Sequence, residues 1–171
     1  MTMSLHADLG DADRARLAAL PLAEKAALAR DLLAQAVREF GPQLAVCWTG
    51  GKDSTLLLWL LRQACREHGL PLPPCVFIEE GDTFPEILEF VERLRRDLDL
   101  ALHTISNHDL LAGSPRIGQE IPLSGLDDAN RRILAEIGYA EAVLPFEPES
   151  TAGTHLTKTV PLRRYIAEHD L

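Results

Sequence analysis

Residues 44–54, with the sequence LAVCWTGGKDS, decide the fold of this 171-residue chain. The first five of these residues form a short apolar run typical of a buried strand, and the next six are polar and rich in glycine. Residues 55–68 then have the composition of a helix, which Gly69 and Pro71 are expected to end. A strand, a glycine-rich turn and a buried helix make the first unit of an α/β domain.

The same alternation continues along the chain. Residues 75–78 are predicted to form a second buried strand, residues 84–98 a helix and residues 100–105 a third strand. Thr83 and Glu86 have the spacing of a capping box at the start of that helix. Alternating strands and helices favour a parallel sheet sandwiched by helices and joined by right-handed crossovers.

The two ends of the chain have weaker patterns. Residues 11–40 are predicted to be helical, with Pro21 suited to a helix start and Gly41 to a stop. This helix either covers the core of the domain or binds a partner, and we expect the first. The predicted organisation is an N-terminal helical segment at 1–41 and an α/β domain at 42–171. Its later part is predicted to contain a loop at 111–125, a helix at 127–137, a strand at 142–144, a loop at 145–153 and a helix at 156–169.

The glycine-rich turn has the chemistry of a phosphate site. Backbone amides in such a turn meet the positive end of the helix dipole, and both favour an anion. Gly50 and Gly51 have no Cβ atom to obstruct the approach, Lys52 adds a cation and Ser54 adds a hydroxyl. The turn is not a Walker A loop, because Val46 stands where that pattern needs glycine and an acid follows the lysine.

Three segments carry a family resemblance. Residues 49–54 resemble the Ser-Gly-Gly-Lys-Asp-Ser signature of the PP-loop ATP pyrophosphatases, with Thr49 in place of the first serine. Residues 79–86 resemble the Asp-Thr-Gly-x-x-Phe-Pro-Glu-Thr segment of phosphoadenosine phosphosulfate (PAPS) reductases, and residues 154–164 resemble their Lys-x-x-Pro-Leu-(Arg/Lys) stretch. The chain therefore resembles the PAPS reductase family, to which the small subunit of ATP sulfurylase is related. The resemblance implies an adenine nucleotide α-hydrolase-like, Rossmann-like fold.

The resemblance also implies a nucleotide site. Lys52, Asp53 and Lys158 are its expected catalytic residues: the lysines would neutralise phosphate, and Asp53 would orient Mg²⁺ or the attacking group. The alternatives are a helix-start charge for Asp53 and an exposed helix lysine for Lys158. Arg163 and Arg164 would bind a 3′-phosphate or sulfate, or would face water. The full set expected to bind the nucleotide is Thr49, Gly50, Gly51, Lys52, Asp53, Ser54, Glu79, Gly81 and Arg163.

The sequence departs from the family pattern at several places. Glu79 stands where the family has Asp, and Glu80 where it has Thr. Gly153 and Thr154 stand where the iron–sulfur members have a Cys-Cys pair, so no iron–sulfur cluster is expected. No cysteine follows Cys75, although the reductases carry a catalytic thiol near their C-terminus. The chain also ends before a further strand of the family, so we expect it to be truncated relative to those proteins.

Other side chains have candidate roles. Glu80 and Asp82 are candidate ligands of Mg²⁺ through water, because hard cations prefer oxygen. His155 is a candidate proton carrier or, alternatively, a capping residue. Cys47 and Cys75 border apolar strands and are expected to be buried and inert.

Charge and composition narrow the class of partner. Seventeen basic and 26 acidic residues give a net charge of −9, which argues against duplex DNA or an anionic membrane as the main partner. Three widely spaced cysteines make neither a disulfide framework nor a zinc quartet. No signal peptide and no apolar run of about 20 residues is visible, so a cytoplasmic protein is expected.

The expected function is binding of ATP or an adenylated sulfate (PAPS or APS) by the PP-loop, in sulfur or sulfate assimilation. The alternatives are an ATP pyrophosphatase or adenylyltransferase, which includes thiolation enzymes, and a non-catalytic regulatory domain. An enzyme is favoured, with Mg²⁺ as a candidate ion. The missing C-terminal cysteine argues against self-sufficient reduction. A homodimer or a partner subunit is a candidate to complete the site.

Overall fold

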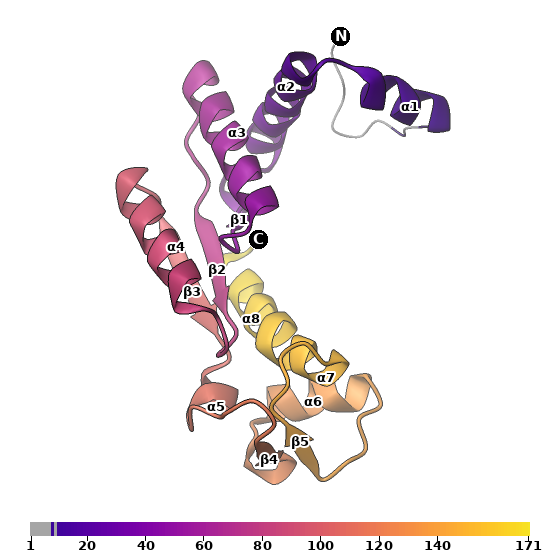
Figure 1. Cartoon of the computed structure of the whole chain (residues 1–171), viewed down its shortest axis with the longest axis vertical. Coiled ribbons are helices and arrows are strands. Elements are labelled where there is room, and N and C mark those ends of the chain that lie inside the picture. Colours follow the sequence, from indigo (N-terminus) through magenta and orange to yellow (C-terminus); the bar gives the residue numbers. More distant parts are fainter. Residues whose placement is uncertain (1–7, 9) are drawn as a thin grey trace. The chain divides into compact units, whose positions relative to one another are not determined.

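The computed structural model describes Asp8 and residues 10–171 (Figure 1). Its contacts divide the chain into two units, the first ending at Pro74 and the second comprising Cys75–Leu171. The boundary predicted between residues 41 and 42 stays a prediction.

The first unit is mainly helical. It contains α1 (Asp11–Ala19), α2 (Leu22–Phe40), a 3₁₀ turn (Gly41–Gln43), β1 (Val46–Cys47) and α3 (Lys52–His68). α2 and α3 lie side by side (Figure 1), and each buries one apolar stripe, with Ala34 and Leu61 among the most deeply buried residues. The helical region predicted over 11–40 is confirmed, and Pro21 and Gly41 flank α2 as its predicted start and stop. Leu20 and Pro21 are extended and separate two helices, because proline has no amide hydrogen for a helical hydrogen bond.

The second unit opens with the predicted strand–helix–strand alternation. β2 (Cys75–Glu79) is followed by α4 (Pro85–Asp97) and β3 (Leu102–Ser106). β2 and β3 pair in parallel, from Cys75 opposite Leu102 to Glu79 opposite Ser106. The predicted α/β class with parallel strands and helices is confirmed.

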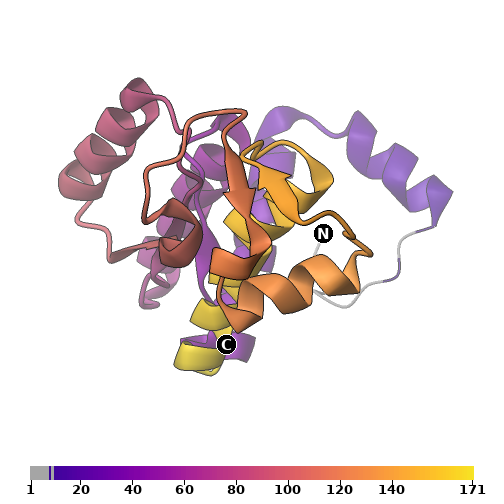
Figure 2. The same cartoon turned by 90° about the horizontal axis from the view of Figure 1, so that it is seen from below.

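A small antiparallel pair follows, which the sequence did not predict. The chain continues through α5 (His108–Leu111), β4 (Glu120–Pro122), a 3₁₀ turn (Leu123–Gly125), α6 (Asp128–Glu136) and β5 (Val143–Pro145). β4 pairs with β5, with Ile121 opposite Leu144, so the loop predicted over 111–125 is wrong at residues 120–122 (Figure 2). Three residues, the last of them a proline, give no alternating pattern long enough to indicate a strand.

The chain ends in one long helical run. α7 (Thr151–Thr154), a π-helical turn (His155–Thr159) and α8 (Val160–His169) follow each other without a break. The run starts earlier than the predicted residue 156, because the Ser150 side chain caps it by accepting a hydrogen bond from the Gly153 amide at 3.0 Å. It packs on a core formed with α5, α6 and β5, whose buried members are Leu110, Leu126, Ile133, Leu134, Leu144, Phe146, Ala152, Leu156 and Val160.

Two local predictions are wrong. The capping box at Thr83 and Glu86 does not form. Phe84 is the N-cap residue of α4, and its side chain makes no capping hydrogen bond. Pro85 fixes the first helical position and holds Phe84 extended. Cys47 is exposed and not buried, since it lies on the face of β1 opposite the buried Val46. Cys75 is buried as predicted, and its burial raises the pKa of the thiol to about 11.

Among the residues that the structure describes, no helix has the length and apolarity to cross a bilayer.

Candidate functional site

The glycine-rich turn is closed by its own hydroxyl groups. The Thr49 amide donates to Ser54 Oγ at 3.3 Å, and Thr49 Oγ1 lies 3.1 Å from the same oxygen. The Gly51 amide donates to Thr49 Oγ1 at 3.4 Å. Gly50 has a φ of 74°, a left-handed conformation that favours glycine. These contacts fix the backbone that leads into α3.

Helix α3 begins at Lys52 and not at the predicted residue 55. Lys52, Asp53 and Ser54 therefore form its first turn, where helix geometry leaves backbone amides without an intrahelical acceptor. The Lys52 ammonium lies 3.1 Å from the Asp53 carboxylate, and both side chains are almost fully exposed. Such an exposed pair contributes little stability, so Lys52 can turn to an anion at the helix start at little cost.

The carboxyl ends of β2 and β3 form an edge in the second unit. Glu79, the last residue of β2, accepts a hydrogen bond from the Gly81 amide at 3.0 Å through Oε1. Gly81 has a φ of 93°, and a Cβ atom there would come within 2.5 Å of Leu111. Ser106, opposite Glu79 in the register, has its hydroxyl 3.1 Å from Nδ1 of His108. Ligands of open α/β sheets bind outside this edge.

Lys158 reaches this edge from the π-helical turn. Its ammonium lies 3.0 Å from Oε2 of Glu80, the residue directly after β2, and 3.9 Å from Oε1 of Glu149. The hydrogen bond to Glu80 raises the pKa of Lys158, with smaller contributions from Glu149 and Asp82. The structure thus brings together Lys158, Glu80 after the second strand, and Glu149.

The π-helical turn is itself unusual. Such turns are rare and occur frequently at functional sites. Thr157 in this turn is buried, and its hydroxyl oxygen has no hydrogen-bond partner in the described part of the chain. An unsatisfied buried hydroxyl costs about 1–3 kcal/mol. This hydroxyl is therefore expected to lower the free energy of unfolding, so stability alone does not explain the turn.

The late arginines face other carboxylates. Arg163 donates to Glu136 at 3.1 Å and is largely exposed. Arg164 donates to Asp127 at 2.5 Å, and it lines a cavity of about 220 Å³ together with Ser106, His108 and Tyr165. The ligand role predicted for the two arginines stays a prediction.

The remaining candidates lie as follows. His155 has Nδ1 2.8 Å from the Thr151 carbonyl oxygen, one helical turn earlier. No group of three or more His, Cys, Asp or Glu side chains suited to a metal ion occurs among the described residues. At Gly153, a Cβ atom would lie 1.8 Å from the Glu147 carbonyl oxygen, so the backbone has no room for a cysteine there. Mg²⁺ binding and the expected lack of an iron–sulfur cluster stay predictions.

The candidate residues therefore form two groups, each within one unit. The first is the turn at 49–54, and the second is Glu79–Asp82 with Lys158. Sequence reasoning missed the pairing of Glu80 with Lys158 and the presence of Glu149. No local sequence pattern indicates which acid contacts a lysine so distant in the chain.

Comparison with protein families identifies part of the chain. The family model of the phosphoadenosine phosphosulfate reductase domain matches residues 43–117. The match runs from just before β1 to beyond α5, and it contains both the turn at 49–54 and Glu79–Asp82. The predicted family is confirmed over this segment, whereas Lys158 and Arg163 lie outside it. No curated protein matches the chain.

Proposed function

We propose that this PAPS reductase-domain protein binds an adenine nucleotide, ATP or an adenylated sulfate such as PAPS or APS, through the PP-loop at residues 49–54. The observation that carries the proposal is the local structure of this loop. Its Lys-Asp-Ser residues form the first turn of a 17-residue helix, directly after a glycine-rich bend within the family match.

The loop has the parts that phosphate binding needs. Amides of the first turn of α3 point along the helix axis, where the dipole favours negative charge. Lys52 supplies a mobile cation, and the hydroxyls of Thr49 and Ser54 hold the bend. Lys158 is proposed as a second cation, and Glu79 and Gly81 as contacts to the nucleoside. In a reaction, these groups would position the nucleotide and neutralise charge that develops on a leaving or bridging phosphate.

With ATP as the nucleotide, we propose adenylyl transfer as the reaction class. Transfer of an adenylyl group would release pyrophosphate from ATP, and the PP-loop would stabilise that leaving group. A role in sulfur or sulfate assimilation is proposed from the family alone. The alternative of a regulatory domain that binds nucleotide without turnover predicts binding with no pyrophosphate release.

Calorimetric titration tests the proposal. The chain is titrated with ATP and Mg²⁺ and with PAPS, and a pyrophosphate assay runs in parallel. Lys52→Ala is expected to weaken binding at least about tenfold, because a cation in contact with phosphate is worth about 1.4 kcal/mol or more. Lys25→Ala is the matched control, since Lys25 lies on α2 and donates to the Ala18 carbonyl. Equal affinity of the wild type and Lys52→Ala would contradict the proposal.

A further inference from the structure

The two asparagines of the chain, Asn107 and Asn130, form a fully buried pair in the second unit. Nδ2 of Asn107 donates to Oδ1 of Asn130 at 2.6 Å, and Nδ2 of Asn130 donates back to Oδ1 of Asn107 at 3.2 Å. The Leu110 amide also donates to Oδ1 of Asn107, at 3.2 Å, and so caps α5. Because an amide can donate only to the oxygen, this contact fixes which end of the Asn107 side chain is the nitrogen.

The same nitrogen makes a second, long-range contact. Nδ2 of Asn107 donates to the Leu156 carbonyl oxygen at 2.8 Å, across 49 positions of sequence. Asn107 directly follows β3, and Leu156 lies in the π-helical turn. This hydrogen bond therefore joins the carboxyl end of the strand to the turn that carries Lys158.

The π-helical turn leaves the Leu156 carbonyl without its usual helical donors. In an α-helix this oxygen would accept from the Val160 amide, four residues later. That amide instead donates to the carbonyl of His155, five residues earlier. The residue five positions after Leu156 is Pro161, which has no amide hydrogen. Leu156 is fully buried, so its carbonyl needs a donor from the protein, and Asn107 supplies it.

The turn has an alternative register. If Val160 donated to Leu156, the turn would become α-helical and its carbonyl would no longer need Asn107. One residue of an α-helix takes about 100° of rotation, so such a change would rotate Lys158 away from Glu80, which its ammonium now contacts at 3.0 Å. We propose that Asn107 is the positioning residue of Lys158: its amide stabilises the π-helical register, which holds the ammonium at the carboxyl end of β2.

All of these contacts lie within the second unit, and the proposal rests on the proposed function only for the role of Lys158 at a nucleotide. Asn107 and Glu80 lie inside the family match at 43–117, whereas Leu156 and Lys158 lie beyond it. The hydrogen bond and the ion pair thus connect the matched segment to the helical run at the C-terminus.

Two serine variants separate position from stability. Asn107→Ser keeps an oxygen that can cap α5, but its side chain is too short to reach Leu156. Asn130→Ser also removes the amide pair, together with the bond from Asn130 to Asp109 at 2.7 Å, and is expected to leave the bond to Leu156 in place. Both variants are expected to lower the midpoint of urea unfolding, by amounts within about twofold of each other.

The position of Lys158 is measured without nucleotide. The chain has three lysines, so ¹³Cε-lysine labelling gives three assignable signals. A lysine held in one position has two separate Hε signals, and a freely rotating lysine has one merged signal. Lys158 is expected to show separate signals in the wild type and in Asn130→Ser. In Asn107→Ser, as in Glu80→Gln, these signals are expected to merge, while those of the other two lysines do not change.

A double variant tests whether Asn107 acts through the ion pair. Asn107→Ser in the Glu80→Gln background is expected to cause no further change in the Lys158 signals. Separate signals in Asn107→Ser alone, or signals that merge equally in Asn130→Ser, would overturn the proposal.

The wild type gives a second test if Asn107→Ser does not fold. Labelling with ¹⁵N-asparagine and ¹³C-carbonyl leucine is expected to show a coupling across the hydrogen bond from Asn107 to Leu156, and a missing coupling would overturn the proposal. If no nucleotide binds while the Lys158 signals behave as expected, the proposed function fails and the positioning role of Asn107 stands.

Discussion

The buried hydroxyl of Thr157 is expected to lower the stability of the helical run at the C-terminus. Its oxygen has no partner among the described residues, whereas Thr154, one turn earlier, donates its hydroxyl to the Pro148 carbonyl at 3.0 Å. The two threonines therefore differ in hydrogen bonding although they share a helical backbone. Thr157 lies directly before Lys158, so the unpaired hydroxyl destabilises the same turn from which the lysine contacts Glu80.

Replacing each threonine by valine measures this difference. Thr157→Val keeps the shape and removes the unsatisfied oxygen, so the free energy of unfolding is expected to rise by about 1 kcal/mol. Thr154→Val removes a satisfied hydroxyl and leaves the Pro148 carbonyl without its donor, so a loss of about 1 kcal/mol is expected. Urea unfolding gives both values. A loss of stability in Thr157→Val as large as that in Thr154→Val would contradict the assignment.

Residue types could be predicted where a short motif carries them. The phosphate-binding chemistry expected of Lys52 and Ser54 follows from the glycine-rich turn alone, because a local pattern carries those residue types, but their place inside the first turn of α3 did not follow from it. The partner of Lys158 could not be predicted, because Glu80 meets it only through the register of the π-helical turn against the end of β2. Side chains distant in sequence pair according to tertiary packing, which no local pattern encodes.

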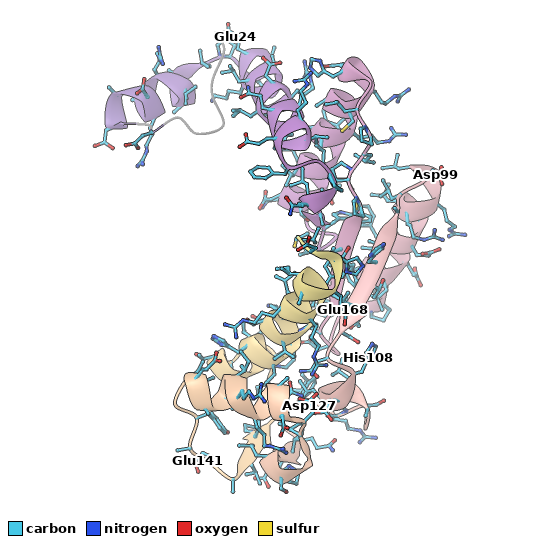
Figure 3. All side chains as sticks on the ribbon, turned by 180° about the vertical axis from the view of Figure 1, so that it is seen from behind. Glu24, Asp99, His108, Asp127, Glu141 and Glu168 are labelled. Carbon is cyan, nitrogen blue, oxygen red and sulfur yellow. The ribbon has the colours of Figure 1, made fainter. Side chains whose placement is uncertain are left out.

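At the scale of elements, the start of α6 depends on Asp127. Its Oδ1 accepts a hydrogen bond from the Asn130 amide at 2.8 Å, and its Oδ2 accepts one from Arg164 of α8 at 2.5 Å. Burial alone would raise the pKa of this carboxyl, but the bonds from Asn130 and Arg164 outweigh it and lower the pKa. Figure 3 labels Asp127 at this helix start. One carboxylate thus caps one helix and holds another.

This pKa shift predicts a pH dependence. A pKa lower in the folded chain than in the unfolded chain gives stability that is complete above the unfolded value, about 3.9, and is lost as the pH falls through the folded value. Asp127→Asn keeps a capping oxygen but loses the charge, so we expect it to cost about 0.5–1 kcal/mol at pH 7. The gap from the wild type should shrink at pH 3. Urea unfolding at both pH values checks this.

Asp128→Asn is the control for that experiment. Asp128 pairs with Arg131 at the exposed surface, within the same turn of α6. Its replacement is expected to change the free energy of unfolding by less than about 0.5 kcal/mol at either pH. A gap for Asp127→Asn that is the same at pH 3 and pH 7 would contradict the role given to its charge.

Most periodic elements were predictable, and the short strand β5 overlaps the strand predicted at 142–144, but the short strand β4 was missed. The pairing of β2 and β3 and the helix between them follow from apolar runs and helical spacing. β4 has three residues and depends on β5 for its hydrogen bonds, so only tertiary contacts define it. The start of α3 was misplaced because Lys52, Asp53 and Ser54 are polar, and a polar first turn resembles a loop in sequence.

At the scale of the whole molecule, many of the basic side chains that the structure describes are paired with carboxylates. Lys52, Lys158, Arg163 and Arg164 each lie within 4 Å of a carboxylate. Arg95 and Arg96 share Glu92, and Arg131 faces Asp128. The net charge of −9 also opposes the binding of a nucleic-acid backbone, which requires a basic surface. A single nucleotide needs only one or two cations.

We therefore expect the chain to bind a single nucleotide but not a nucleic acid. The chain is expected to bind neither a 20-base-pair DNA duplex nor an RNA hairpin below about 10 μM at 0.15 M salt, measured by fluorescence anisotropy, because its net charge of −9 opposes association with a phosphate backbone. Lowering the salt weakens screening and so strengthens both the repulsion from the net charge and any local attraction. With carboxylates in excess, repulsion should dominate and binding should stay absent. Binding that strengthens steeply as salt falls would show that some of these ion pairs open to phosphate backbones, and a nucleic-acid substrate would then replace the small nucleotide as the ligand to test first.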